Sequence, residues 1–140
     1  MSALTEDKIL RVSGDEINIR EETIGAGQTV FAGGFVMRED ASPSTIKPGA
    51  DTAAHSIAGV ALDGGTDGEV VKVRARGVVG NFAYGPANAD RSLIGKPLCL
   101  VDDNTVALAA DTTNEVFAGY CWEVISTGVV QVYLPGTIAA

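Results

Sequence analysis

The sequence predicts an all-β protein, a compact β-sandwich or barrel-like domain built from short strands. Glycine is abundant, with 17 residues in 140, and the sequence leans toward valine, isoleucine and alanine. Such a mixture suits many short strands and turns. Apolar and polar residues alternate with a period of two in several runs, as in half-buried strands. Groups of Gly, Pro, Asn and Asp separate these runs at close intervals, a spacing typical of sandwiches and barrels.

The clearest pair of strands lies between residues 57 and 79. The run Ile57–Leu62 is apolar, and Asp63–Gly68 after it is rich in residues that tolerate turn conformations. Residues 71–79 then alternate, with Val71, Val73, Ala75 and Val79 on one face and three cations on the other. The pattern predicts a single hairpin whose second strand is half-buried.

Shorter runs predict the remaining strands. The polar stretch 38–56 is expected to be a long loop, with one short strand at Ser44–Lys47 as the alternative. One helical turn is expected within residues 87–94. About nine or ten strands result, and those outside the hairpin are expected near Val30–Phe31, Phe35–Met37, Gly80–Tyr84, Leu98–Val101, Thr105–Ala109, Val116–Val124 and Val129–Leu134.

Two segments of the chain resemble each other weakly. Ile57–Ala61 reads IAGVA and Phe117–Cys121 reads FAGYC. Each is followed, about a dozen residues later, by a strand with alternating valines. The similarity predicts two related edges of one barrel-like sheet, although its period is too loose for a solenoid.

Residues 1–22 differ in composition from residues 23–140. They are rich in charge, and their apolar residues form only short alternating patches. We therefore expect residues 1–22 to be an N-terminal arm and residues 23–140 to be the β domain. Such an arm can add a strand to a partner's sheet edge, its apolar side chains filling pockets. The residues expected to do so are Ile9, Val12, Ile17 and Ile19; the alternative is an ordinary first strand of the domain.

Charge and cysteine content limit the possible partners. The net charge of −8 argues against nucleic acid and against an anionic membrane surface. No apolar run approaches the length of a transmembrane helix, and residues 1–10 lack the apolar core of a secretory signal. Cys99 and Cys121 lie among apolar strand residues, so we expect buried, reduced thiols, with a disulfide as the alternative.

No recognisable catalytic or metal-binding set is present. His55 is the sole histidine and falls in the polar stretch, so it has no second histidine for a metal pair or a proton relay. The Asp63–Glu69 segment has the carboxylates of a calcium loop but lacks the ligand spacing of an EF-hand, and we interpret it as a hairpin loop. The sequence therefore predicts a protein that is not an enzyme, with no cofactor and no metal.

Two groups of side chains are candidates for contacts. Lys72, Arg74 and Arg76 share one face of the predicted strand and could meet acidic residues of a neighbouring subunit or a larger partner; the alternative is a solvated strand face. By strict alternation, Tyr120 and Trp122 share a face with Val116, Ala118 and Val124. That placement predicts core packing, with an interface anchor as the alternative.

Five short motifs follow one another along the chain: G-V-A at 59–61, V-x-V-x-x-x-G at 71–77, G-x-P-L-C at 95–99, A-G-Y at 118–120 and V-x-V-Y-L-P-G at 130–136. In this order they resemble the phage head decoration proteins, also called capsid cement proteins. The resemblance covers about residues 24–136. The Asp63–Gly68 loop, the basic strand and Phe82–Tyr84 look like the lambda type of decoration protein.

The resemblance implies an all-β homotrimer that sits on the outside of an icosahedral head and stabilises the shell without catalysis. It implies the major capsid protein as partner and the outer capsid surface of the virion as location, after synthesis in the host cytoplasm. The N-terminal arm would clasp the shell, and the Lys72 row would make a subunit or shell contact. One alternative is a trimeric all-β enzyme of the dUTPase type, whose G-x-V-D-x-x-Y-R-G-like motif is missing. Another is a β-sandwich binding module, which would need exposed aromatic residues.

Overall fold

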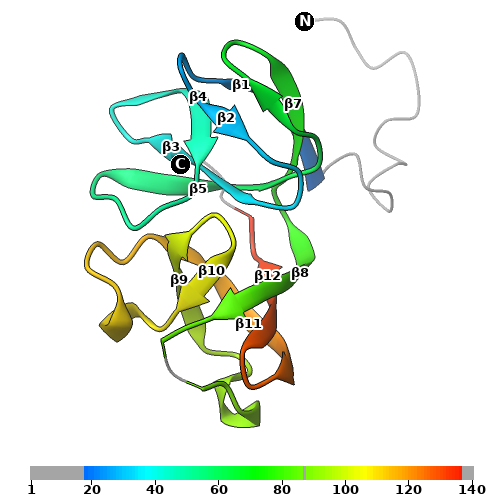
Figure 1. Ribbon diagram of the computed structural model, residues 1–140, viewed down its shortest axis with the longest axis vertical. Coiled ribbons are helices and arrows are strands. Elements are labelled where there is room, and N and C mark those ends of the chain that lie inside the picture. Colours follow the sequence, from blue (N-terminus) through cyan, green and yellow to red (C-terminus); the bar gives the residue numbers. More distant parts are fainter. Residues whose placement is uncertain (1–17, 87, 137–140) are drawn as a thin grey trace, which may run out of the picture.

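The computed structural model describes residues 18–86 and 88–136, and these residues form an all-β fold, as the sequence predicts. The strands form two closed five-stranded barrels and one two-stranded sheet. One barrel lies above the other along the long axis, and the chain passes from the first to the second between β7 (Val70–Arg74) and β8 (Gly77–Tyr84) (Figure 1). Two barrels replace the one barrel-like sheet that the sequence suggested.

The first barrel has the strand order β1-β4-β3-β5-β7. Strand β1 closes it by pairing in parallel with β4 and antiparallel with β7. The short strands β2 and β6 pair with each other and add a small sheet. The bounds are β1 (Ile19–Ile24), β2 (Thr29–Val30), β3 (Phe35–Glu39), β4 (Ser42–Pro48), β5 (His55–Ala61) and β6 (Gly65–Thr66).

The second barrel has the strand order β10-β8-β12-β11-β9. Strand β8 pairs in parallel with β10 and antiparallel with β12. The helical turn expected within residues 87–94 is the 3₁₀ helix η3 (Arg91–Leu93), and a second turn, η4 (Ala109–Asp111), follows β10. The other bounds are β9 (Pro97–Asp102), β10 (Thr105–Ala107), β11 (Phe117–Ser126) and β12 (Val129–Leu134).

The two barrels share one topology. Strands β8, β9, β10, β11 and β12 take the places of β1, β3, β4, β5 and β7, in the same order along the chain and around the barrel. The register agrees as well. In the parallel pair, Ile24 lies opposite Ile46 in the first barrel and Tyr84 opposite Val106 in the second, so both residue numbers rise by 60.

The same backbone hydrogen bonds recur outside the strands. The amide of Gly33 donates to the carbonyl of Ala61 at 2.8 Å, and the amide of Gly95 donates to the carbonyl of Cys121 at 2.8 Å. Both glycines have a φ of +87°, which favours glycine. The chain is therefore a structural repeat, with one barrel built from residues 18–76 and again from residues 77–136. The weak similarity in sequence between Ile57–Ala61 and Phe117–Cys121 marks this repeat.

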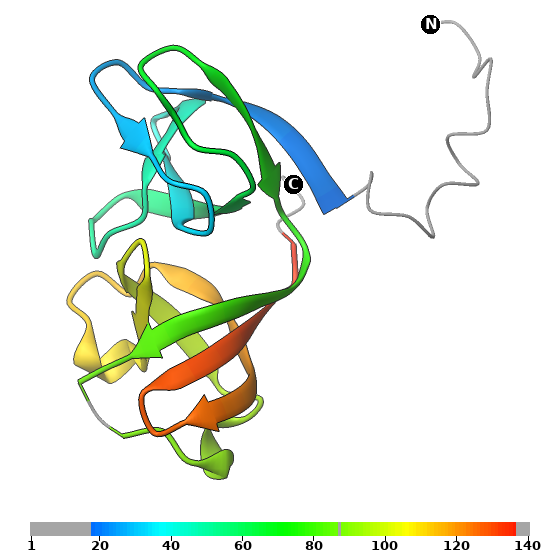
Figure 2. The same cartoon turned by 45° about the vertical axis from the view of Figure 1, so that its right-hand side comes forward.

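Phe35 links the two barrels. Although it belongs to β3 of the first barrel, its ring stacks on that of Phe82 in the second, with centroids 4.1 Å apart and planes at 25°. Its amide donates to the carbonyl of Asp103 at 2.8 Å, and its side chain is completely buried. Burying a phenylalanine stabilises a fold by about 1.5–3 kcal/mol, so this contact holds the barrels together. Figure 2 shows the two barrels side on, with the passage between them at the right.

Two sequence predictions about the strands need correction. Residues 71–79 are not one strand: β7 ends at Arg74, and Gly77, with φ +113°, starts β8 in the other barrel. The stretch 38–56 is not a long loop, because β4 occupies its middle and pairs with β1 and β3. The alternative of a short strand at Ser44–Lys47 is confirmed, although β4 is longer on both sides, and with only Ile46 fully buried its sequence has no apolar period.

A glycine in each barrel lies very close to the next strand. A Cβ atom on Gly59 would lie 2.1 Å from the carbonyl oxygen of Arg74, and one on Gly119 would lie 2.4 Å from that of Tyr133. These oxygens belong to the backbone and cannot move aside as a flexible side chain can. Each barrel therefore closes around a position that only glycine fits.

We predict that Gly119→Ala lowers the free energy of unfolding by about 1–3 kcal/mol, because the added methyl group forces β11 and β12 apart. The matched control is Gly128→Ala, where an added Cβ meets nothing within 4 Å; its effect should stay within about 0.5 kcal/mol. Urea denaturation measures both. Equal stabilities of the two variants would contradict this account of closure.

Candidate functional site

The start of β1 corrects the expected boundary of the N-terminal arm. Ile19 is the first residue of β1 and lies opposite Arg74 of β7. Residues 19–22 therefore belong to the first barrel, as the alternative of an ordinary first strand requires, and no boundary follows residue 22. The other three arm residues lie outside the described residues; they are Ile9, Val12 and Ile17.

The basic row runs along β7 and into the connection between the barrels. Lys72 is exposed, whereas Arg74 and Arg76 are half-buried. The Nη1 of Arg74 donates to the carbonyl oxygen of Arg76 at 3.4 Å. The Nε of Arg76 lies 3.0 Å from where a Cβ of Gly136 would stand, so its side chain covers that glycine. The three cations thus follow β7 to the passage between the barrels, and they do not share one face of a single strand.

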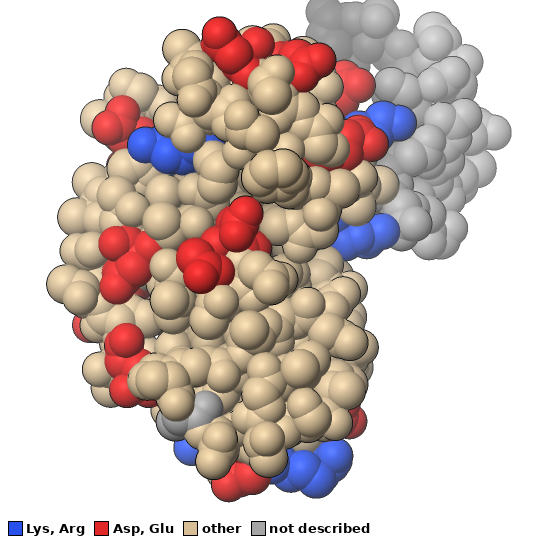
Figure 3. All heavy atoms as spheres, viewed as in Figure 1, with Lys and Arg blue, Asp and Glu red and all other residues tan. Residues whose placement is uncertain are grey.

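The structure brings this row beside the first described residues. The amide of Ala75 donates to the carbonyl of Asn18 at 2.6 Å, just beyond the pair of Ile19 and Arg74. Glu21 lies opposite Lys72 on the same two strands. Figure 3 shows cationic side chains at the right of the first barrel, next to acidic ones. The chain therefore enters the first barrel next to the basic row, which the sequence could not show because 50 residues and more separate the two segments.

The Asp63–Glu69 segment is a hairpin loop, as predicted. It connects β5 to β7, which pair antiparallel, and it contains β6. The Glu69 carboxylate accepts hydrogen bonds from the amide and the hydroxyl of Thr66, at 2.6 and 3.1 Å, and these bonds lower the pKa of Glu69. An Asp63 carboxylate oxygen accepts from the amide of Lys72 at 3.2 Å. Both carboxylates stabilise the loop itself.

Tyr120 and Trp122 do not pack in the core. They are 41% and 55% exposed, whereas Ala118 and Cys121 on the same strand are buried. The cause is a β-bulge: Phe117 and Gly119 lie opposite successive residues of β9, so Ala118 is the extra residue and the alternation shifts by one. Core packing was the wrong prediction, and the alternative of an interface anchor stays open.

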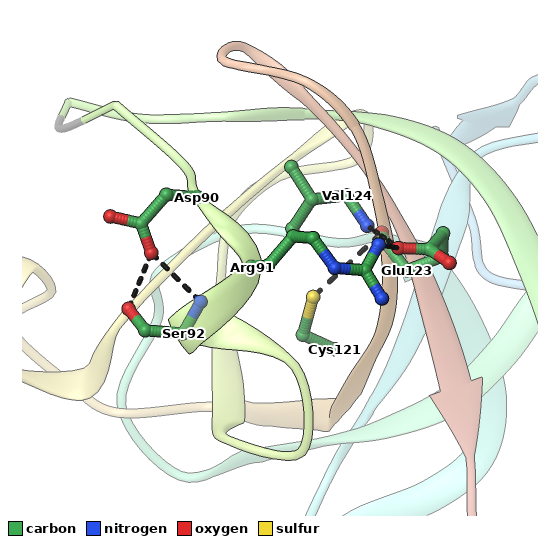
Figure 4. Close-up of polar contacts among 6 residues, drawn as sticks. All are labelled: Asp90, Arg91, Ser92, Cys121, Glu123 and Val124. Carbon is green, nitrogen blue, oxygen red and sulfur yellow. Dashed lines mark hydrogen bonds and ion pairs between the residues drawn. The ribbon is translucent and has the colours of Figure 1, made fainter.

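Cys99 and Cys121 are buried free thiols, as predicted. Burial raises the pKa of each thiol, with smaller contributions from the carboxylates of Glu115 and Glu123 respectively. Figure 4 shows Cys121 with its sulfur 3.8 Å from the carbonyl oxygen of Glu123. A protonated, buried thiol is a poor nucleophile, so neither residue has the character of a reactive cysteine.

The described residues contain no group of three or more His, Cys, Asp or Glu side chains that could hold a metal ion. His55 begins β5, where its Nδ1 lies 2.8 Å from the carbonyl oxygen of Ala53. An opening of about 200 Å³ between the barrels is lined by apolar side chains and glycines, without a titratable group. Within the described part of the chain, no helix is long and apolar enough to cross a membrane.

No protein-family model matches the chain, and no curated protein matches it.

We predict that both thiols react slowly with a thiol reagent in the native protein and rapidly after unfolding. Because the folded state raises their pKa above the ordinary value of 9.0, their stabilising contribution is present below about pH 9 and is lost as pH rises through the folded-state pKa. Labelling kinetics at pH 8 and urea unfolding at pH 8 and 10 measure the two effects. In a Cys99→Ala, Cys121→Ala variant the loss of stability with pH should be smaller. Rapid native labelling, or an unchanged loss in the variant, would disprove the assignment.

Proposed function

We propose that the chain is a decoration, or cement, protein that attaches as a homotrimer to the outside of an icosahedral phage head. Its partner is the major capsid protein, and its place is the outer surface of the virion. In this role it is not an enzyme, needs no cofactor and binds neither nucleic acid nor membrane. The motif order along residues 24–136 supports the class of protein.

The observation that carries the proposal is the placing of the basic row beside the start of β1. Ile19 faces Arg74 across the two strands, and Lys72 stands exposed two residues away. A cationic surface in a chain of net charge −8 is suited to an acidic partner surface and sets the register of contact. The residues before Asn18 would then reach that partner from the same place, so arm and cations would act as one attachment site.

A rigid trimer explains how small sites can attach firmly. Each copy offers one site of limited area, and binding of the first raises the effective concentration of the other two, up to the millimolar range for short spans. Avidity can exceed the single-site affinity by about 10²–10⁴ in this way. The closed barrels support this role, because a rigid subunit keeps its own site in a fixed position relative to its contacts in the trimer.

A binding module for carbohydrate or peptide is a second candidate. That class needs exposed aromatic side chains, and the exposure of Tyr120 and Trp122 favours it. Protection of Trp122 from acrylamide by an added polysaccharide or peptide, in a chain that stays monomeric, would support this candidate.

We predict that Lys72→Glu weakens binding to purified empty shells at least about tenfold, because it reverses a charge at the centre of the attachment site. The matched control is Lys96→Glu, which makes the same change on an exposed residue before β9 in the second barrel. Co-sedimentation at low and high salt measures the binding. If the two variants bind shells equally well, the basic row is only a solvated face.

We also predict that deleting residues 2–17 leaves the fold and the oligomer mass intact while weakening attachment to shells. The deletion ends before Asn18, so every described pairing of β1 is kept. Circular dichroism and sedimentation give the fold and the mass, and co-sedimentation gives the binding. A truncated protein that attaches as strongly as the full chain would leave residues 2–17 without this role.

A further inference from the structure

The second barrel carries a row of aromatic side chains, which we name the aromatic strip: the exposed Phe117, Tyr120 and Trp122 of β11 and the half-buried Tyr133 of β12. The rings of Phe117 and Tyr120 meet edge to face with centroids 5.3 Å apart, and those of Trp122 and Tyr133 are 6.0 Å apart. Tyr120 and Tyr133 are cross-strand neighbours, so the two pairs form one continuous surface. It contains the single tryptophan of the chain and two of its three tyrosines.

The strands that carry the strip are almost free of charge. Strands β8, β11 and β12 lie next to one another and contain a single charged residue, Glu123. Its carboxylate already accepts a hydrogen bond from Arg91 at 2.9 Å and another from the amide of Val124 at 3.0 Å (Figure 4). In Figure 3 the right-hand side of the second barrel is accordingly almost without charged side chains. The face formed by β8, β11 and β12 is therefore nearly neutral, although the chain as a whole is acidic.

The repeat supplies an internal comparison for part of this face. In the first barrel, Phe35 lies opposite Val60, and both are buried in the cluster that the second barrel completes. In the second barrel the same register places Pro97 opposite Tyr120, and both are exposed. The positions that dock one barrel on the other are therefore apolar again in the second barrel, where no described residue covers them.

The positions next to these, on β7 and β12, are charged in the first barrel and uncharged in the second. Lys72 and Arg74 of β7 correspond to Gln131 and Tyr133 of β12, by the shared pairing of the strands. The first barrel thus has two cations where the second has an amide and an aromatic ring. Since the backbone is the same, the two barrels differ here in surface chemistry: the first is cationic, and the second is neutral with one aromatic ring.

We propose that the aromatic strip is the face through which copies of this chain associate, strip against strip. The association rests on this surface alone; only a count of three copies rests on the proposed function. Two molecules of net charge −8 repel each other, and the neutral face lets them approach with the least repulsion. Exposed tyrosine and tryptophan are also the residues that most often anchor such contacts.

A contact of the strip with the far end of another first barrel fits less well. Inside the chain, Phe35 docks on Phe82 and beside Leu100, which lies 3.0 Å from where a Cβ of Gly49 would stand. The corresponding residues of the first barrel are Glu22 and Arg38, which form an ion pair. A docking end that is apolar in one barrel is charged in the other. Head-to-tail stacking of chains is therefore disfavoured, and we expect a closed oligomer in which the aromatic strips face one another.

The test uses Tyr120→Glu, which places a carboxylate in the strip and keeps Trp122 as a fluorescent reporter. The matched control is Phe31→Glu, since Phe31 is 66% exposed, follows β2 of the first barrel and belongs to neither aromatic pair of the strip. Sedimentation should show the full chain and the control as multiples of 14.4 kDa and Tyr120→Glu as the monomer. Loss of one central aromatic anchor should weaken association at least roughly 100-fold. Acrylamide should quench Trp122 weakly in the oligomer and strongly in the variant.

Three results would overturn the proposal. One is a full chain that is monomeric at all concentrations. Trp122 would then be shielded from acrylamide by residues 1–17 of the same chain, by shells, or by an added polysaccharide or peptide. Shielding by a polysaccharide or peptide would favour the binding module. Another is an oligomer in which Trp122 stays fully quenchable. The third is a Tyr120→Glu variant that keeps the oligomer mass. An oligomer that depends on Tyr120 but never binds shells would leave this inference standing and would remove the proposed attachment to a phage head.

Discussion

Closure of each barrel depends on one close contact between a glycine and the backbone of the next strand. Five strands can close only if they tilt and approach tightly, and Gly59 and Gly119 make this approach beside the carbonyls of Arg74 and Tyr133. A β-bulge immediately precedes each glycine, at Ala58 and Ala118. The bulge decides which side chains of β5 and β11 point inward, so the outer surfaces of both barrels follow from this local geometry.

The same backbone carries two different surfaces. Phe35 and Val60 on the first barrel are buried because the second barrel stands against them, whereas Pro97 and Tyr120 in the same register stay exposed. Comparing the two barrels distinguishes residues that the barrel fold requires from residues that suit the surface each barrel presents. Residues that recur at equivalent positions, such as the two glycines with φ +87°, serve the barrel. Residues that differ serve what each barrel touches.

The sequence predicts the all-β class and most strands, because period-two alternation and turn residues are local signals. It favours a loop where β4 lies and gives the strand only as an alternative, because the exposed Ser42, Pro43, Ser44 and Thr45 show no apolar alternation. It also joins β7 to β8, because alternation continues through the passage between barrels while the backbone changes barrel. The exposure of Tyr120 and Trp122 could not be predicted by strict alternation, since one extra residue at Ala118 reverses it. The closeness of Ile19 to Arg74 depends on pairing between distant segments, which no local pattern encodes.

The ion pair of Glu22 and Arg38 gives the first barrel a charged end where the second barrel has an apolar one. Both side chains are largely withdrawn from water, at 11% and 21% exposed, and a partly buried ion pair adds little net stability because its desolvation offsets the attraction. An apolar pair, like Phe82 and Leu100 in the second barrel, would pack the same position at least as well. It would also give a further barrel an apolar surface on which to dock, as Phe35 docks within the chain. The charged pair forgoes some apolar burial and makes that end a poor partner for another barrel, whereas the aromatic strip stays apolar and open to contact.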